Sequence, residues 1–325
     1  MGCASCNGSS IPFAKLHGLG NDFIVIDDRE ERLELSAAQV AHLCDRHRGI
    51  GADGLMLVRP PVTSGASAYM RYHNADGSLA EMCGNGIRCF AKFMVDWGIA
   101  RPRSDGWMTI DTLSGPHALK VQLGTDGRMV GATVDMGAPV LELAQVPVDA
   151  GAARSAGDAG GEGPAGERGS VVELDSPWGA LRPCCVSMGN PHAVCLVDSW
   201  DGLPRELFVH GAAPGLDAFN LDAVGAFFER HAAFPEHVNV EFACVEGEGA
   251  IRMRVFERGC GETLACGTGA CAVLVAAVLT GRSGPEAAVE LPGGTLQVAW
   301  RRNGRVAMTG PVEQSFTGSV QLPQA

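Results

Sequence analysis

The sequence predicts an α/β (α+β) protein of two pseudo-symmetric halves that face each other across a cleft. Cys83 and Cys266 each open a Cys-Gly-x-Gly turn ahead of a helix-like run, and Asn21 and Asn190 each follow a glycine shortly before a strand-like run. The two kinds of turn occur in the same order in both halves, which indicates an internal duplication. The 325 residues are sufficient for two domains, each with its own core.

The repeat suggests where the two domains begin and end. We expect residues 1–128 to form the first half, with a C-terminal strand over residues 308–325 returning to it, and residues 129–307 to form the second half. Residues 150–170 are rich in glycine and alanine and have no apolar period. Such a composition predicts a flexible insertion in the second half.

In the first half, strand-like runs outnumber helix-like ones. Ser36 is a suitable N-cap for a helix that ends near residue 46, and a second helix is predicted over residues 87–97, directly after the first cysteine turn. Alternating and apolar runs bounded by turn residues predict the strands of this half. These runs cover residues 13–28 (with a tight turn at 18–21), 55–58, 68–74, 107–112, 118–123 and 129–136.

The second half shows the same mixture. One helix is predicted over residues 222–230, and another follows the second cysteine turn as the apolar run 270–279. Strands are predicted over residues 171–174, 181–187, 192–198, 238–242, 250–257, 288–291, 295–300 and 305–308.

A glycine pattern at residues 49–54 matches the dinucleotide-binding sequence G-x-G-x-x-G. In dinucleotide sites a helix follows this pattern, because its N-terminus binds the pyrophosphate. Here the apolar run 55–58 predicts a strand instead, which argues against a nucleotide site.

Composition narrows the class of protein. Hydrophobic residues make up 46% of the chain and charged residues 19%, as in a folded globular protein. The net charge of −12 argues against a nucleic-acid partner, because binding phosphates requires a basic face. No apolar run approaches the ~20 residues of a membrane span. Twelve cysteines without a secretory signal indicate a reducing compartment, so we expect a cytoplasmic protein.

The two repeated cysteines are the candidate reactive groups. The dipole and the N–H groups at the start of a helix favour a thiolate over a thiol, and the same N–H groups can bind a carboxylate. If Cys83 and Cys266 face one cleft, a thiolate can remove a proton from one face of a carbon acid while a thiol returns a proton to the other face.

Other uses of the cysteines have less support. Cys3-x-x-Cys6 is half of a zinc pattern, but no second pair completes it, so we expect no metal. A disulfide oxidoreductase would need Cys-x-x-Cys at a helix start. Pyridoxal phosphate would need a Schiff-base lysine, and Lys15, Lys92 and Lys120 all lack a phosphate-binding context, which favours chemistry without a cofactor.

Several of these motifs together resemble the diaminopimelate epimerase family. They are Leu-His-Gly-Leu-Gly-Asn-Asp-Phe at 16–23, Asn-Ala-Asp-Gly-Ser at 74–78, Cys-Gly-Asn-Gly-Ile-Arg-Cys at 83–89, Met-Gly-Asn-Pro-His at 188–192, and the stretch from Glu-Arg-Gly at 257–259 to Cys-Gly-Thr-Gly at 266–269. The resemblance implies that each half is a curled, mostly antiparallel sheet around a central helix. It implies cofactor-independent interconversion of LL- and meso-2,6-diaminopimelate, in lysine and peptidoglycan precursor biosynthesis, by a homodimer.

The resemblance also assigns roles to individual residues. It makes Cys83 and Cys266 the acid/base pair, and His192 a neighbour that tunes protonation near them. The residues expected to bind substrate are Asn21, Asn74, Gly84, Asn85, Asn190, Asn239, Glu257, Arg258, Gly267 and Thr268.

The sequence departs from the family's pattern at two positions, and two other functions stay open. Gly54 stands where some members of the family carry a polar side chain, and Cys260 is an additional thiol in the second cysteine turn. A proline or hydroxyproline racemase would share the fold and the paired cysteines, but the asparagines with Glu257 and Arg258 favour a substrate with a second amino-acid end. A non-catalytic, thiol-rich binding or metal-storage protein is the alternative from another class.

Overall fold

The computed structural model describes residues 10–322, which lie in two compact units. Of the described residues, the first unit comprises 10–134 and 310–322, and the second comprises 135–309. The sequence predicts that the second half covers residues 129–307, so its two boundaries differ by six and two residues from those of the structure. Cys3 and Cys6, the half zinc pattern, lie outside the described residues.

The first unit is a mixed sheet with two helices, α1 (Ala37–Cys44) and α2 (Gly84–Asp96). Its strands pair in the order β19–β1–β2–β3–β4–β6–β7–β8, and β5 pairs with β4. Among these pairs of described residues, β2–β3 and β4–β6 are parallel and the others are antiparallel. The strands are β1 (Ile11–Gly18), β2 (Asn21–Asp27), β3 (Gly54–Arg59), β4 (Ala68–Asn74), β5 (Leu79–Ala80), β6 (Trp107–Thr112), β7 (Gly115–Leu123), β8 (Met129–Gly137) and β19 (Glu313–Val320).

The second unit contains α3 (Leu221–Glu229), α4 (Gly267–Leu279) and the short 3-10 helix η1 (Arg205–Leu207). Its strands pair in the order β9–β10–β11–β12–β13–β14–β16–β17–β18, and β15 pairs with β14. The strands are β9 (Arg154–Asp158), β10 (Ser170–Glu173), β11 (Cys184–Ser187), β12 (Pro191–Leu196), β13 (Asn239–Gly247), β14 (Ala250–Glu257), β15 (Gly261–Thr263), β16 (Glu286–Leu291), β17 (Gly294–Trp300) and β18 (Val306–Pro311).

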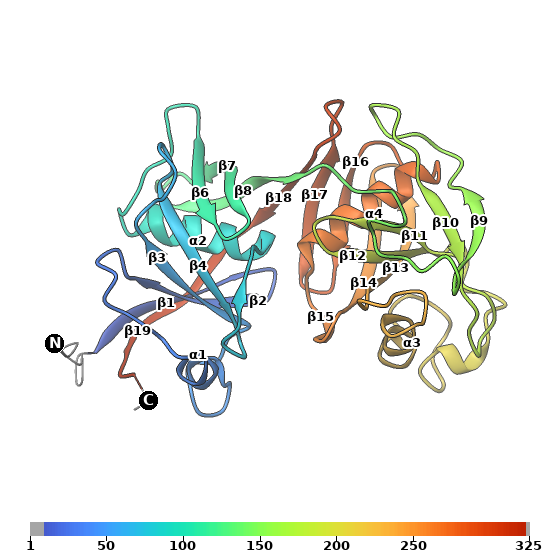
Figure 1. Cartoon of the computed structure of the whole chain (residues 1–325), viewed down its shortest axis with the longest axis horizontal. Coiled ribbons are helices and arrows are strands. Elements are labelled where there is room, and N and C mark those ends of the chain that lie inside the picture. Colours follow the sequence, from blue (N-terminus) through green and yellow to red (C-terminus); the bar gives the residue numbers. More distant parts are fainter. Residues whose placement is uncertain (1–9, 323–325) are drawn as a thin grey trace. The chain divides into compact units, whose positions relative to one another are not determined.

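The two units repeat one topology (Figure 1). Each pairing from β1 to β8 recurs from β11 to β18, including the parallel pairs β12–β13 and β14–β16. Likewise α1 and α3 follow the second strand of the repeat, and α2 and α4 follow its fifth strand. The expected α+β fold of two pseudo-symmetric halves, each sheet-dominated, is therefore confirmed.

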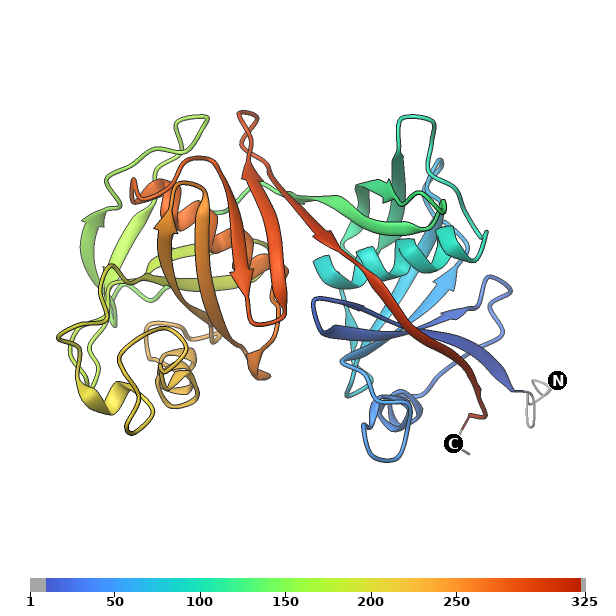
Figure 2. The same cartoon turned by 180° about the vertical axis from the view of Figure 1, so that it is seen from behind.

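The helices that follow the cysteine turns are the centres of the two units. In α2, every residue from Gly84 to Met94 is buried, and this helix contacts β1, β2 and β19. All of α4 except Thr268 is buried, among strands β11 to β14, β16 and β17. A helix that is apolar on all sides, as α4 is, needs such an enclosure. The helix α2 also buries Arg88 and Lys92, whose charged groups donate to backbone carbonyl oxygens. In the first unit β19 completes the enclosure of α2 by pairing with β1 from the other end of the sequence (Figure 2).

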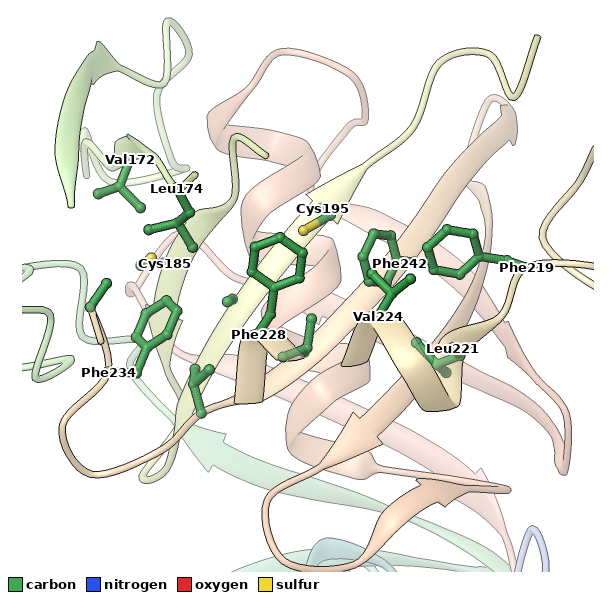
Figure 3. Close-up of a cluster of buried hydrophobic side chains, with 14 of the residues drawn as sticks. Val172, Leu174, Cys185, Cys195, Phe219, Leu221, Val224, Phe228, Phe234 and Phe242 are labelled. Carbon is green, nitrogen blue, oxygen red and sulfur yellow. The ribbon is translucent and has the colours of Figure 1, made fainter. Parts of the chain in front are cut away.

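A second apolar layer lies between each sheet and its other helix. In the first unit, Val40 and Leu43 of α1 pack against strand residues such as Ile24, Ile26 and Leu55. In the second, Figure 3 shows Leu221, Val224 and Phe228 of α3 beside Cys195 and Phe242 of the sheet. The ring centroids of Phe219 and Phe242 are 4.4 Å apart, so this layer is closely packed.

Part of the segment 150–170, predicted as a flexible insertion, forms regular structure although most of its residues are exposed or half-buried. Residues 154–158 form strand β9, which pairs with β10. The N–H of Gly161 donates to the carbonyl oxygen of Leu279, at 2.6 Å, and a Cβ at Gly163 would lie 2.4 Å from the ring of Trp300. Glycine therefore allows this segment to pack closely against the end of α4 and β17.

Two further points concern sequence patterns. Gly54 begins strand β3, so a strand does follow the G-x-G-x-x-G pattern. Among the described residues, no helix is long and apolar enough to cross a membrane.

Candidate active site

Cys83 caps the N-terminus of α2, three residues after the end of β5. Its Sγ accepts a hydrogen bond from the N–H of Gly86, at 3.4 Å. A Cβ at Gly86 would lie 3.2 Å from Cβ of Cys83 and 2.3 Å from Cε of Met56. The second glycine of the Cys-Gly-x-Gly turn is therefore needed for the thiol to sit against the helix start.

Asn21 is the partner of Cys83 on the sheet side. Its Oδ1 accepts from Sγ of Cys83, at 3.7 Å, and from Nδ2 of Asn85, at 3.3 Å. Its Nδ2 donates to Oδ2 of Asp53, at 2.7 Å. The first unit therefore brings three predicted site residues together, and Asp53 orients one of them.

Asp22 and its cationic neighbours support this corner. Lys15 lies 2.8 Å from Oδ2 of Asp22, and Arg46 contacts both oxygens of Asp22 as well as Asp53. Burial alone would raise the pKa of Asp22, but the hydrogen bonds and charges of Arg46 and Lys15 outweigh it and lower the pKa to about 2. Asp22 is thus a carboxylate at neutral pH.

Arg88, which the sequence did not single out as a site residue, is completely buried one turn into α2. Its guanidinium donates to Oδ1 of Asn85, at 2.8 Å, and to the carbonyl oxygens of Gly84 and Pro311. A planar guanidinium can serve several acceptors at once. Arg88 thereby holds Asn85 with its amino group toward Asn21.

Asn74 and Gly54 lie opposite each other on β4 and β3. Nδ2 of Asn74 donates to Oγ of Ser78, at 3.0 Å. A Cβ at Gly54 would lie 2.6 Å from the ring of Tyr72. The ring of Tyr72 thus fills the space that a side chain at residue 54 would need.

Cys266 caps α4 in the same way as Cys83 caps α2. Its Sγ accepts from the N–H of Gly269, at 3.4 Å, and lies 3.5 Å from Oγ1 of Thr268. A Cβ at Gly269 would lie 2.9 Å from Oε1 of Glu241 and 3.3 Å from Sγ of Cys266. Glycine is again the residue that fits between the thiol and the strand beneath.

The protonation of Cys266 differs from the sequence-based expectation of a thiolate. Burial raises the pKa of this thiol well above its usual value, and the carboxylates of Glu257 and Glu241 raise it further. The hydrogen bonds from Thr268 and Gly269 oppose this shift without cancelling it. The surroundings of Cys266 therefore favour the neutral thiol, because desolvation and two acidic neighbours outweigh the helix start.

Glu257, Arg258 and Asn239 lie at the ends of β13 and β14. Oε1 of Glu257 accepts from Oγ1 of Thr263, at 2.5 Å. The side chain of Asn239 is buried and contacts the backbone, donating to the carbonyl oxygen of Pro191 at 2.8 Å and accepting from the N–H of Arg258 at 2.9 Å. The guanidinium of Arg258 is exposed and donates to the carbonyl oxygen of Glu236.

His192 contacts Asn190 and also Glu241, a residue that the sequence did not indicate. Nδ1 of His192 lies 2.6 Å from Oε1 of Glu241, and Nε2 lies 3.1 Å from Oδ1 of Asn190. The side chains of His192 and Glu241 are both fully buried. The sequence does place a glutamate within the predicted strand 238–242, between Val240 and Phe242. A charged residue in such a strand indicates a buried partner, because buried carboxyl groups are usually paired.

The described residues contain no group of three or more His, Cys, Asp or Glu side chains arranged to hold a metal ion.

Comparisons with known proteins point to one family over most of the chain. The family model described as diaminopimelate epimerase matches residues 13–142 and 184–314. Diaminopimelate epimerase of Leptospira biflexa is 38% identical over 312 residues, covering 96% of this chain and 99% of that protein. Diaminopimelate epimerase of Synechococcus elongatus is 44% identical over 321 residues, with the same coverage of both proteins.

Solved structures share the fold at much lower identity. A probable proline racemase from Agrobacterium radiobacter aligns with a TM-score of 0.65 and 19% identity, covering 96% of this chain and 93% of that one. A hydroxyproline epimerase from Agrobacterium vitis aligns with a TM-score of 0.65 and 16% identity, covering 96% and 91%. These similarities concern the architecture alone.

Proposed function

The chain belongs to the diaminopimelate epimerase family of isomerases, and on that premise we propose that it interconverts LL-2,6-diaminopimelate and meso-2,6-diaminopimelate without a cofactor. The observation that carries the proposal is the repeated placement of a cysteine as N-cap of the central helix, Cys83 on α2 and Cys266 on α4.

In the proposed mechanism each unit supplies one thiol to the same α-carbon. One cysteine, as thiolate, takes the α-proton, and the electron pair of the broken C–H bond spreads into the α-carboxylate. The other cysteine, as thiol, gives its proton to the opposite face of the carbon. The configuration is inverted and the two sulfur atoms have exchanged protonation states. The reverse reaction uses the same pair with the roles exchanged.

The helix starts suit the charge that forms during this reaction. The dipoles of α2 and α4 favour negative charge at Gly84, Asn85, Gly267 and Thr268, so we assign these residues to the reacting carboxylate. A carboxylate that gains charge as the proton leaves is then held more strongly in the transition state than in the ground state.

The remaining polar residues are assigned to the other ends of the substrate. The asparagine side chains provide donors for a carboxylate and acceptors for an ammonium group. The exposed guanidinium of Arg258 suits the distal carboxylate and Glu257 an ammonium group. The asparagines assigned in this way are Asn21, Asn74, Asn190 and Asn239.

Support for chemistry without pyridoxal phosphate comes from the lysines. Nζ of Lys15 is paired with Asp22, and Nζ of Lys92 is paired with Asp96 at 2.8 Å and donates to the carbonyl oxygen of Met129. A buried lysine in such contacts would have to break them before its amino group could form a Schiff base.

The wider setting is also part of the proposal. We place the enzyme in the cytoplasm, in the synthesis of lysine and peptidoglycan precursors, as a homodimer in which the two units of each chain correspond to the two epimerase halves. Light scattering on the purified chain measures the oligomeric state directly.

Proton exchange in D2O tests the function. The unaltered chain should place deuterium at one α-carbon of diaminopimelate while converting the LL to the meso isomer. Cys83→Ser and Cys266→Ser should each lose the conversion, while Cys244→Ser, a half-buried cysteine on β13, should retain it. Exchange with proline but not with diaminopimelate would assign the protein to the racemases. Tight zinc retention without exchange of either substrate would favour a binding protein.

A further inference from the structure

Glu241 and His192 form a buried pair between neighbouring strands of the second unit. They lie on β13 and β12, which are parallel, and neither side chain is exposed. Oε1 of Glu241 is 2.6 Å from Nδ1 of His192, while Oε2 of Glu241 has no hydrogen-bond partner among the described residues. The second ring nitrogen, Nε2, lies 3.1 Å from Oδ1 of Asn190.

The number of protons in this pair follows from its partners. A carboxylate oxygen and an amide oxygen both accept hydrogen bonds, whereas a neutral imidazole has one N–H. A neutral imidazole beside an ionised carboxylate therefore satisfies only one of the two contacts of His192. Both are satisfied if the pair holds one proton more than this, either on Nδ1 of the ring or on the carboxyl group of Glu241. In both arrangements Nε2 carries a hydrogen and the pair has no net charge.

Burial favours this neutral pair. An uncompensated charge at a fully buried position is costly, whereas a shared proton removes the cost. Burial raises the pKa of Glu241, His192 opposes the shift, and the negative charge of Glu257 on β14 adds to it. The charge of Glu241 also raises the pKa of two neighbouring thiols, those of Cys266 at the start of α4 and Cys195 on β12.

The orientation of Asn190 in the structure, with Oδ1 facing Nε2, agrees with a proton on Nε2. Because Oδ1 of Asn190 accepts from the ring, its amino group points away from His192 as a donor. Asn21 in the first unit has the opposite arrangement, since its amino group binds Asp53 and its oxygen accepts from Cys83. The two asparagines lie in matching turns but are held by opposite ends of the amide. The carboxylate of Asp53 holds the amino group of Asn21, and the ring N–H of His192 holds the oxygen of Asn190.

We propose that Glu241, acting through His192, is a positioning residue that turns the amino group of Asn190 toward a carboxylate of the substrate. This inference rests on the proposed function for the identity of the substrate. When the pair loses its proton, the remaining ring hydrogen stays on Nδ1 with the carboxylate. Nε2 then becomes an acceptor, Asn190 rotates its amide to donate to it, and an amide oxygen faces the substrate carboxylate. Substrate binding therefore weakens as the pH rises through this step.

The test combines NMR of the histidine ring with kinetics, and compares the unaltered chain with Glu241→Gln. In 15N-histidine-labelled protein, the ring signals that disappear in His192→Asn belong to His192. At neutral pH, Nε2 should carry a proton, and this proton should be lost at the same alkaline pH at which KM for diaminopimelate rises. The rise in KM should be about tenfold or more, with kcat changing less.

Glutamine at residue 241 should remove this pH dependence. Its amide can donate to Nδ1, which leaves the ring hydrogen on Nε2 at every pH, so KM should stay at its neutral-pH value. Glu246→Gln changes an exposed glutamate on the same strand and should follow the unaltered chain.

Two results would overturn the inference: an unprotonated Nε2 of His192 at neutral pH, or a KM of Glu241→Gln that follows the pH course of the unaltered chain. The NMR titration needs no substrate. If no variant turns over diaminopimelate, the proposed function fails, and the ring titration of the two proteins still decides whether Glu241 sets the proton on Nε2.

Discussion

Nδ2 of Asn21 lies 2.7 Å from Oδ2 of Asp53, and this contact turns the amide oxygen of Asn21 toward the thiol of Cys83. An amide oxygen accepts a hydrogen bond from a thiol but repels a thiolate, so the orientation of Asn21 favours the thiol form of Cys83.

We expect Asp53→Ala to lower kcat for diaminopimelate about fivefold to tenfold, because the amide of Asn21 then loses the acceptor that orients it. Asp126→Ala changes an exposed aspartate of the β7–β8 turn in the same unit and should leave kcat unchanged. Steady-state kinetics of both variants checks this. Equal kcat values for the two would show that Asp53 does not act on the site.

The substitution Gly269→Ala should lower the activity of the enzyme more than its stability. The added Cβ would lie 2.9 Å from Oε1 of Glu241 and 3.3 Å from Sγ of Cys266, so one of them must move. Overpacking of this kind costs about 1–3 kcal/mol, and displacement of the thiol should lower kcat more than tenfold. Gly284→Ala is the control, because a Cβ there meets nothing within 4 Å. Unchanged kcat in Gly269→Ala would contradict this packing.

Acid should remove the stability that Asp22 provides. Its pKa is lowered from 3.8 to about 2, so its contribution is complete above pH 3.8 and is lost as the pH falls through about 2. In Asp22→Asn this contribution is absent at every pH and the buried Lys15 loses its counter-charge. Urea unfolding between pH 7 and pH 2 measures the effect. The free energies of unfolding of the variant and the unaltered chain should converge toward pH 2, and a constant difference would argue against the linkage.

Two adjacent phenylalanines of α3 provide a matched test of the core in the second unit. Phe228 is 2% exposed and lies in the apolar layer of Figure 3, whereas Phe227 is 36% exposed. Phe228→Ala should lower the free energy of unfolding by about 3–5 kcal/mol, because it leaves a cavity. Phe227→Ala should cost about 1 kcal/mol. Chemical denaturation of both variants gives the comparison, and similar losses would refute the assignment.

The sequence was most informative where local chemistry repeats. The paired Cys-Gly-x-Gly turns identified the starts of α2 and α4 to within a few residues, because a cap and an apolar run are neighbours in the chain. Strands β5 and β15, of 2 and 3 residues, were not predicted because a pattern of alternation needs more residues than they contain.

What the sequence could not provide were properties that arise from contacts distant in the chain. The thiolate expected at Cys266 assumed an exposed helix start, whereas burial and the carboxylates of Glu241 and Glu257 favour the thiol. Asp53 and Glu241 orient Asn21 and Asn190 only because separate strands bring them together. Residues 154–158 form β9 through pairing with β10, which no local propensity indicates.

The pairing of β1 with β19 has a consequence for how the protein forms during translation. Residues 135–309 are continuous, so the second unit has its complete sheet before the last residues leave the ribosome. The first unit does not, since β1 meets its partner only when residues 313–320 have been synthesised. Until then one side of α2 lacks the strand that covers it, so the N-terminal part of the chain is the last to complete its fold and the more exposed to aggregation and proteolysis on the way.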